Sequence, residues 1–385
     1  MGYWNGTEKF FKFMAKKYFP KKTILTAGPS ISAKEVKYVL DAVKNGWNEK
    51  YDYYIQRFSE EFAKYVGVKY AWPTSSGTGA LHAALLALDI KKGDEVIIPE
   101  ITFVASANVV EFVGATPVFV DVEKDTWTID VKDVERKITS KTKAIMPVHI
   151  YGNVSDMKGI NKIAKKHNLY VIEDACPSLG AEYYGKKTGS LSDVAAFSFQ
   201  GAKISVTGEG GMLVTNNKNL FEKAKYWGNN AKDDKKLFWH TDIGYMYRMS
   251  NLLAALGLAQ LERTDSFVDK KRKIFQWYKD RLGNLDGISM NVEKKGTKSI
   301  YWMSSIVIDK KTRLNREEIM SLLKENKVDT RPFFYPVSML PMWKEQKTPN
   351  AHHVGLNGIN LPSGVLLKEI EVDYICNQIK SVLNL

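Results

Sequence analysis

The chain has 385 residues, 44% of them hydrophobic and 12% aromatic, a composition typical of a globular protein with about two or three structural units. Its formal charge of +13 is compatible with phosphorylated ligands, but we find no zinc-finger spacing and no basic-aromatic RNA-binding signature, so we expect no nucleic-acid partner. Cys176 and Cys376 form neither a disulfide framework nor a metal-site spacing. No apolar run approaches the ~20 residues of a membrane helix, and we expect a cytoplasmic location.

Residues 1–22 form a basic extension with six lysines and one glutamate. Thr7 to Phe19 is predicted to be an amphipathic helix, with aromatic residues on one side and lysines on the other, ended by Pro20. We expect its aromatic side to pack on this protein or on a second subunit. Contact of residues 1–22 with an anionic membrane surface is the alternative.

Helices and strands are predicted to alternate from residue 32 to residue 215. In chain order we expect a helix from Ser32 to Asn45, a helix at Phe58–Val66, a helix at Thr78–Leu88, a strand at Glu95–Pro99, a helix at Ala105–Val113, a strand at Pro117–Val122, a strand at Ala144–Val148, a helix at Met157–His167, and strands at Leu169–Glu173, Val194–Phe199 and Met212–Thr215. Alternation at this spacing is typical of an α/β fold with a mostly parallel sheet, covered on both faces.

The C-terminal part has a different pattern. A long helix from Asn251 to Arg272 or beyond is predicted to leave the first unit, followed by a strand at Ile300–Ile308 and helices at Arg316–Lys324 and Ile370–Leu383. These segments indicate a smaller α+β domain. We therefore predict an extension at residues 1–22, a large domain at residues 23–265 and a small domain at residues 266–385.

Lys203 and Asp174 form the pair of residues that carries the most chemical information. Lys203 ends the run Phe197–Lys203, which the glycine-rich segment Thr207–Gly211 follows, and Asp174 ends an apolar run. A lysine amine forms a Schiff base with pyridoxal phosphate (PLP), and a carboxylate against the pyridine nitrogen keeps that nitrogen protonated, so that the ring accepts electrons. Each residue alone is more simply a solvated lysine or an ordinary strand-end carboxylate. In these contexts together they favour a PLP enzyme.

A second signal is the segment Thr74–Leu81, in which small residues open the helix predicted at Thr78–Leu88. Glycines permit close backbone approach, and the free amides at the start of a helix bind a phosphate. Simple helix capping explains the same residues equally well. The segment is not a Walker loop and no G-x-G-x-x-G follows a strand, so ATP and NAD are not expected.

The chain resembles the DegT/DnrJ/StrS sugar aminotransferases, which are PLP enzymes of the aspartate-aminotransferase superfamily, from about Thr26 to its C-terminus. Within that family it is most similar to nucleotide-sugar 4-aminotransferases. The motifs that carry the resemblance are Ser76–Leu81, Gly93–Ile97, Thr102–Asn108, Glu173–Ala175, Phe197–Lys203, Gly208–Gly211, Gly244–Asn251, Tyr301-Trp302, Arg331–Pro336 and Asn360–Ser363. The resemblance implies PLP fold type I, with a large PLP-binding domain and a smaller C-terminal domain.

The resemblance also implies roles for individual residues. The cofactor contacts are Gly77, Thr78 and Ser198 at the phosphate, Phe103 stacked on the pyridine ring, Asp174 at the ring nitrogen and Lys203 in the covalent link. It further implies a homodimer in which two subunits share each active site. As substrate contacts we expect Arg331, whose guanidinium suits a diphosphate or a glutamate carboxylate, with Phe333 and Tyr335 of the same motif.

Three positions depart from the family pattern. Pro177 stands where relatives carry a polar side chain near the cofactor's ring oxygen, and Met246 replaces the asparagine that reaches the partner's cofactor phosphate. We expect that Arg248 replaces this second contact. Asn48–Asp52 stands where a Ser-Ser-x-Gly segment is usual, which affects substrate contacts.

The reaction implied is transfer of an amino group from L-glutamate to the C4 ketone of a nucleotide-linked 4-keto-6-deoxyhexose, with Lys203 moving the proton. Burial beside a cationic cofactor lowers the pKa of a lysine enough for this role. The alternatives are a C3-specific aminotransferase, a PLP sugar dehydratase and a non-catalytic sugar-sensing regulator. The related dehydratases carry histidine at the position of Lys203, which argues against that alternative.

Overall fold

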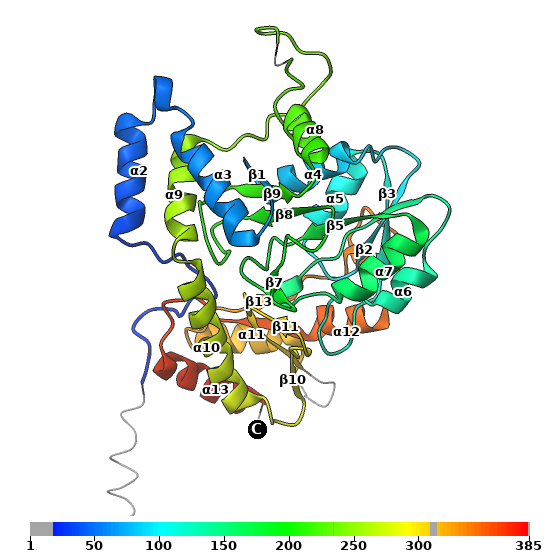
Figure 1. Ribbon diagram of the computed structural model, residues 1–385. Helices are drawn as coiled ribbons and strands as arrows, with labels where there is room; N and C mark the ends of the chain where they lie inside the picture. Colours follow the sequence, from blue (N-terminus) through cyan, green and yellow to red (C-terminus); the bar gives the residue numbers. More distant parts are fainter. Residues whose placement is uncertain (1–17, 234, 309–313, 384–385) are drawn as a thin grey trace, which may run out of the picture.

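The computed structural model describes residues 18–233, 235–308 and 314–383. The helix predicted at Thr7–Phe19 lies outside this range except for its last two residues, so most of that prediction falls outside the described residues. Figure 1 shows a large α/β unit around a central sheet and, below it, a smaller sheet with helices α10, α11 and α13. Within the described ranges, no helix is both long enough and apolar enough to cross a membrane.

The central sheet has seven strands, and β9 alone among them runs antiparallel to its neighbours. In spatial order they are β1 (Tyr70–Thr74), β9 (Gly211–Thr215), β8 (Val194–Ser198), β5 (Tyr170–Asp174), β4 (Thr142–Ile145), β2 (Glu95–Pro99) and β3 (Thr116–Val120). Most of these strands are buried along nearly their whole length, as expected for a sheet with helices on both faces. The predicted α/β class with a mostly parallel sheet is confirmed.

Helices cover both faces of this sheet. They are α2 (Ala33–Asn45), α3 (Tyr53–Val66), α4 (Gly77–Ala87), α5 (Ala105–Phe112), α6 (Val131–Arg136), α7 (Met157–His167), α8 (Lys218–Gly228) and α9 (Asn251–Leu261). The predicted bounds of α7 coincide with the observed ones, those of α4 differ by one residue at each end, and those of α5 differ by one residue at the C-terminal end. The sequence analysis did not predict α6, which is too short for a periodic signal, or α8, whose apolar residues are few.

The prediction of one continuous helix from Asn251 to Arg272 is wrong. The structure ends α9 at Leu261 and begins α10 (Thr264–Leu282) after two intervening residues. At the break, the side chains of Gln260 and Arg263 both donate to the carbonyl oxygen of Ser30, each at 2.9 Å. These long-range contacts redirect the chain toward the small unit, and apolar periodicity continues through the break, so the sequence pattern gave no sign of it.

The small unit is built on an antiparallel sheet of β10 (Ile288–Met290), β12 (Ser304–Ile308), β14 (Gly358–Leu361) and β13 (Arg331–Pro332). Three further helices accompany it: α11 (Arg316–Glu325), α12 (Pro349–Asn357) and α13 (Glu369–Leu383). A third sheet joins β11 (Thr297–Lys298) to β6 (Glu182–Tyr183) and β7 (Lys186–Lys187) of the large unit. The strand predicted at Ile300–Ile308 begins only at Ser304, because Tyr301 has φ +46° and turns the chain.

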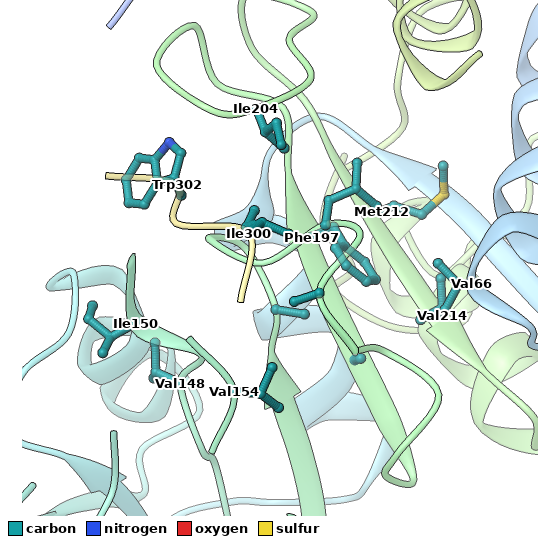
Figure 2. Packing of buried hydrophobic residues seen from close by; sticks show 14 of the residues in the cluster. Val66, Val148, Ile150, Val154, Phe197, Ile204, Met212, Val214, Ile300 and Trp302 are labelled. Atoms are coloured by element: carbon teal, nitrogen blue, oxygen red, sulfur yellow. The ribbon is translucent and has the colours of Figure 1, made fainter. Parts of the chain in front are cut away.

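One hydrophobic core cluster contains residues of both units. Figure 2 shows Phe197, Met212 and Val214 of the central sheet in the same cluster as Ile300 and Trp302, which precede β12. The segment that leads into the small sheet is thereby packed against the large one. The division of the chain at residue 266 stays a prediction, since this core is continuous across it.

Lys271 on α10 is a buried lysine whose ionisation is expected to make stability depend on pH. Its side chain is 3% exposed and donates to the carbonyl oxygen of Trp302 at 2.7 Å. Burial lowers its pKa to about 7, whereas an unfolded lysine titrates near ~10.4. Between these values the unfolded chain binds a proton that the folded chain lacks. The free energy of unfolding therefore rises with pH in this window, by up to about 1.4 kcal/mol per pH unit.

Urea unfolding of the wild-type protein at about pH 7 and about pH 9 is expected to show this gain. Lys271→Met should reduce the gain by about 1 to 2 kcal/mol, because methionine does not titrate. Lys273→Met, two residues along the same helix at an exposed position, is the matched control and should keep the wild-type gain. An equal pH dependence in Lys271→Met and wild type would contradict the assignment.

Candidate functional site

A cavity of about 470 Å³ lies where the carboxyl ends of β5 and β8 meet the start of α4. Ligands of open α/β sheets bind at this edge, because loops diverge there and helix N-termini point toward it. The residues around it come from six segments of the chain: Ser76–Thr78 and Leu81, Thr102–Phe103 with Ala105–Ser106, Val148 and Ile150, Asp174 with Cys176-Pro177, Ser198–Glu209 in part, and Trp302 with Phe334.

Lys203 enters this cavity from a turn that follows β8. The turn is closed by a bridge between Gln200 and Gly208, and the amide of Lys203 donates to the carbonyl oxygen of Gln200 at 2.8 Å. Its Nζ lies 4.0 Å from the centroid of the Trp302 ring. Burial lowers the pKa of the Lys203 ammonium, while Cys176 and Asp174 oppose that shift. A lysine in this setting is more readily neutral, and therefore nucleophilic, than one in water.

Asp174 ends β5 with its carboxylate in the cavity wall, and the side chain is nearly buried. Its Oδ2 accepts from Ser106 Oγ at 2.7 Å, and its Oδ1 accepts from the amide of Cys176 at 3.1 Å. Ser106 Oγ is in turn 2.7 Å from Thr102 Oγ1. One donor on each oxygen fixes the carboxylate and leaves lone pairs for a protonated ring nitrogen.

The neighbouring Glu173 contacts a different set of groups from Asp174 and is fully buried. Its carboxylate accepts from the amides of Gly189 and Leu191 and from Ser192 Oγ, at 2.8 to 2.9 Å. Its Oε2 also lies 2.9 Å from Nε2 of the buried His149. This network anchors the end of β5, so the strand presents Asp174 from a fixed backbone.

The start of α4 fits a phosphate group. Ser76 caps the helix, with its Oγ accepting from the amide of Gly79 at 3.0 Å, and Gly77 and Thr78 line the cavity in the first turn. A Cβ on Gly77 would lie 2.8 Å from Cys176 Sγ and 2.9 Å from Ser198 Cβ. Only glycine therefore permits this approach of the helix to β8. A helix N-terminus, a fixed carboxylate and a lysine around one cavity are the set of groups that PLP requires.

Gly77→Ala is expected to weaken PLP binding by about 10- to 100-fold, because the new Cβ displaces the first turn of α4 and its amide donors. Titration of the cofactor-free protein with PLP measures this affinity. Gly364→Ala is the control, since the nearest atom to its added Cβ is 3.7 Å away. Wild-type affinity in Gly77→Ala would show that the phosphate does not bind there.

The structure brings together six of the seven predicted cofactor contacts in the wall of this one cavity, namely Gly77, Thr78, Phe103, Asp174, Ser198 and Lys203. Phe103 is 56% exposed and lies 5.7 Å from the Phe334 ring, so its face is available to a ligand. Pro177 also lines the cavity and offers no side-chain donor or acceptor. The roles assigned to these residues stay predictions.

Arg248 does not line the cofactor cavity of its own chain. It lies in a separate cavity of about 420 Å³ with Tyr51 and Asp52, and its backbone is bridged to Thr74. Met246 is 56% exposed and lines none of the described cavities. The predicted contact of Arg248 with a cofactor phosphate is therefore not made within one chain and requires a second subunit.

A second cavity of about 790 Å³ adjoins the first and shares six residues with it: Thr102, Phe103, Gln200, Ala202, Trp302 and Phe334. Arg331, Phe333 and Tyr335, the three predicted substrate contacts, line it. The Arg331 guanidinium is 68% exposed and lies 3.6 Å from Asp329 Oδ2. This cavity is large enough for a ligand that reaches the cofactor cavity.

Phe333 also lines this larger cavity although its side chain is largely buried, and its contact with substrate stays a prediction. The side chain is 1% exposed, with its ring 5.0 Å from Trp127 and 4.7 Å from Tyr151. Along the extended segment after β13, its ring points into the core, so it supports the cavity wall from behind. Phe334, for which no role was predicted, lines both cavities.

Trp302 and Ser106 are residues of the site that the sequence analysis did not assign. Trp302 lies in a motif that carried the family resemblance, but nothing in the motif indicates that its ring faces Lys203. Ser106 follows Phe103 by three positions, at the start of a helix, where a serine is ordinarily a cap. Only the tertiary structure places it against Asp174.

Comparison with known proteins supports this assignment of the site. Residues 29–380 match the model of the DegT/DnrJ/EryC1/StrS aminotransferase family. The chain is 45% identical to a GDP-perosamine synthase of Escherichia coli O157:H7, over 91% of this chain and 96% of that protein. It is 42% identical to a GDP-perosamine synthase of Vibrio cholerae, over 92% of this chain and 98% of that protein.

Similar solved structures support the same fold and the same enzyme class. A sugar aminotransferase of Streptococcus pneumoniae, in its PMP form and its PLP form, matches with TM-scores of 0.88 and 0.87 at 26% identity. The two matches cover 94% of this chain and 98% and 99% of the other. The predicted fold type, the predicted cofactor PLP and the predicted enzyme class, a PLP-dependent sugar aminotransferase, are confirmed. The chain belongs to the DegT/DnrJ/EryC1/StrS aminotransferase family.

Proposed function

We propose that this enzyme transfers an amino group from L-glutamate to the C4 ketone of a nucleotide-linked 4-keto-6-deoxyhexose and so forms a 4-amino sugar nucleotide. The observation that carries the proposal is the convergence of Lys203, Asp174 and the start of α4 on one cavity that opens into a larger one. The names of the GDP-perosamine synthases to which the chain is similar favour a GDP-linked sugar and a C4 ketone. GDP-perosamine for a lipopolysaccharide O-antigen is the product that fits these names.

Each residue of the cofactor cavity has a distinct task in this reaction. PLP supplies an electron sink that stabilises negative charge on the carbon that loses a proton. Asp174 keeps a carboxylate against the ring nitrogen, held by Ser106 and the Cys176 amide. The first turn of α4 binds the phosphate. Lys203 would hold the cofactor between turnovers and, once released, would accept the proton with its neutral amine, which burial favours, and return it from the ammonium.

The larger cavity is the proposed site of the sugar nucleotide. Arg331 offers an exposed guanidinium there for a diphosphate, and Tyr335 is 44% exposed at the same wall. Thr26 donates to Asp329, with its amide 3.1 Å from Oδ2, and Asp329 faces Arg331. The segment around Thr26 and strand β13 thus define the position of the guanidinium.

A homodimer is the proposed assembly. Three apolar residues on α2, Val36, Leu40 and Val43, follow one another at helical spacing and are 47 to 58% exposed. Phe238 and Ile243, in the loop before α9 that projects from the top of Figure 1, are 84% and 93% exposed. A second copy that covers these surfaces would explain their composition and would supply Arg248 to the partner's site. Light scattering on the purified chain tests this, and a monomer mass would contradict it.

Incubation with L-glutamate and a panel of GDP-, UDP- and dTDP-linked 4-keto-6-deoxy sugars, read by mass spectrometry, tests the reaction. We expect an amino sugar nucleotide from a GDP-linked substrate, with 2-oxoglutarate formed in equal amount. Arg331→Met should raise KM more than it lowers kcat, whereas Arg136→Met at the exposed end of α6 should change neither.

Other outcomes of the panel identify the alternatives. Amination at C3 would indicate the C3-specific enzyme, and loss of a sugar hydroxyl group with no amino group retained on the sugar would indicate a dehydratase. Ligand binding with no turnover on any substrate would indicate a sugar-sensing regulator. A cytoplasmic location and the role of residues 1–22 stay predictions, and vesicle co-sedimentation with and without those residues distinguishes their packing on protein from membrane contact.

A further inference from the structure

Trp302 lies at the boundary between the two cavities and lines both. The Nζ of Lys203 is 4.0 Å from the centroid of its ring, over the ring face. The indole Nε1 donates to the carbonyl oxygen of Ala202, the residue before Lys203, at 2.8 Å. The indole is therefore bonded to the same turn that carries the lysine.

The backbone of Trp302 is fixed from the opposite side. The buried Lys271 donates to its carbonyl oxygen at 2.7 Å. The preceding Tyr301, at φ +46°, stacks on Phe275 with ring centroids 3.6 Å apart, and the amide of Ile300 donates to Gly152 at 3.1 Å. With the side chain 6% exposed, the indole has one available position.

An ammonium over an indole face is attracted by the negative potential of the ring, and tryptophan is the strongest of the aromatic residues in this respect. The attraction is greatest where water is excluded, as in this cavity. The titratable groups that share the cavity with Lys203 are Asp174, Cys176 and Glu209. Burial disfavours the ammonium of Lys203, and the ring face acts against that effect.

We propose that the ammonium of Lys203 binds to the face of the Trp302 ring whenever the lysine is not bonded to the cofactor. Lys271 is then a positioning residue, because it fixes the backbone of Trp302. The inference rests on the role proposed for Lys203 in the reaction. Between the two half-reactions the lysine is free, and its amine has to reach both the cofactor and the sugar. Because Trp302 lies at the boundary of the two cavities, this contact keeps the amine next to both and away from solvent.

The test measures the pKa of free Lys203 directly. Full-length protein is treated with L-glutamate, which converts the cofactor to its amino form and releases the lysine. Trace acetic anhydride is then added at a series of pH values, and mass spectrometry quantifies acetylation of Lys203 against the exposed Lys165. Only a neutral amine reacts, so the midpoint of the reactivity profile reports the pKa.

Trp302→Leu is expected to lower the midpoint by about 0.5 to 1 pH unit, because the ammonium loses the ring face. Trp302→Phe should lower it by less, since it keeps a ring with a weaker face. Both variants lack the indole donor, so the difference between them isolates the ring. If the leucine variant does not fold, the midpoint of Trp302→Phe is compared with that of the wild type instead.

Lys271→Met is expected to shift the midpoint in the same direction as Trp302→Leu. Lys271 donates to the carbonyl oxygen of Trp302 at 2.7 Å, so its loss removes a contact that fixes the backbone of Trp302 below the indole. Lys273→Met should leave the midpoint unchanged.

Equal midpoints in wild type, Trp302→Phe and Lys271→Met would overturn the inference. Conversion of the cofactor to its amino form by L-glutamate in the same proteins would still support the proposed function. A wild-type protein that does not respond to L-glutamate would overturn both.

Discussion

Replacement of Lys203 by alanine is expected to abolish covalent attachment of PLP and to lower turnover by about 10³-fold or more. No other lysine lines the cofactor cavity within the described residues, so none is placed to substitute for it. The visible absorbance band of lysine-linked PLP measures the first effect, and glutamate-dependent amination of the sugar nucleotide measures the second.

Lys186→Ala is the matched control, because Lys186 is exposed on β7 and lies outside the cavity. It should keep the full band and full turnover. A Lys203→Ala protein that retained both would show that the lysine at the end of the turn after β8 is not the residue that bonds the cofactor.

Asp174→Asn is expected to separate cofactor attachment from catalysis. Lys203 and the start of α4 remain, so PLP still binds covalently, but a neutral amide no longer keeps the ring nitrogen protonated. Turnover should fall by about 10² to 10⁴-fold, since the ring loses much of its capacity to accept electrons. Stopped-flow measurement of the half-reaction with glutamate isolates this step.

Ser106→Ala is the graded comparison for this prediction. It removes one donor from Asp174 Oδ2 but keeps the charge, so a loss of about 10-fold or less is expected. If Asp174→Asn were no slower than Ser106→Ala, the carboxylate would have only a structural role.

The large unit was predictable because its signals are local and repeated. Strands such as Glu95–Pro99 are continuous apolar runs between helices, and β2 has those bounds in the structure. The small unit was less predictable, because β13 has two residues and β14 four, too few for a pattern. The break between α9 and α10 depends on Gln260 and Arg263 binding Ser30, a contact between segments more than 200 positions apart.

The candidate site also contains residues that the sequence predicts and residues that it does not. Gly77 begins α4, Asp174 ends β5 and Lys203 lies in the turn after β8, so the sequence indicates which edge of the sheet they share. Phe333 and Phe334 are adjacent aromatic residues, and the sequence does not tell which side chain is almost fully buried and which lines both cavities. That choice follows from the pairing of β13 with β14.

The continuous core of Figure 2 has a consequence for how substrate enters. Ile300 and Trp302, just before β12, share one apolar cluster with the central sheet, so rotation of the small unit as a rigid body would expose that cluster to water. Opening by domain rotation is therefore energetically costly in this chain. The two sheets are therefore expected to unfold together as one cooperative unit.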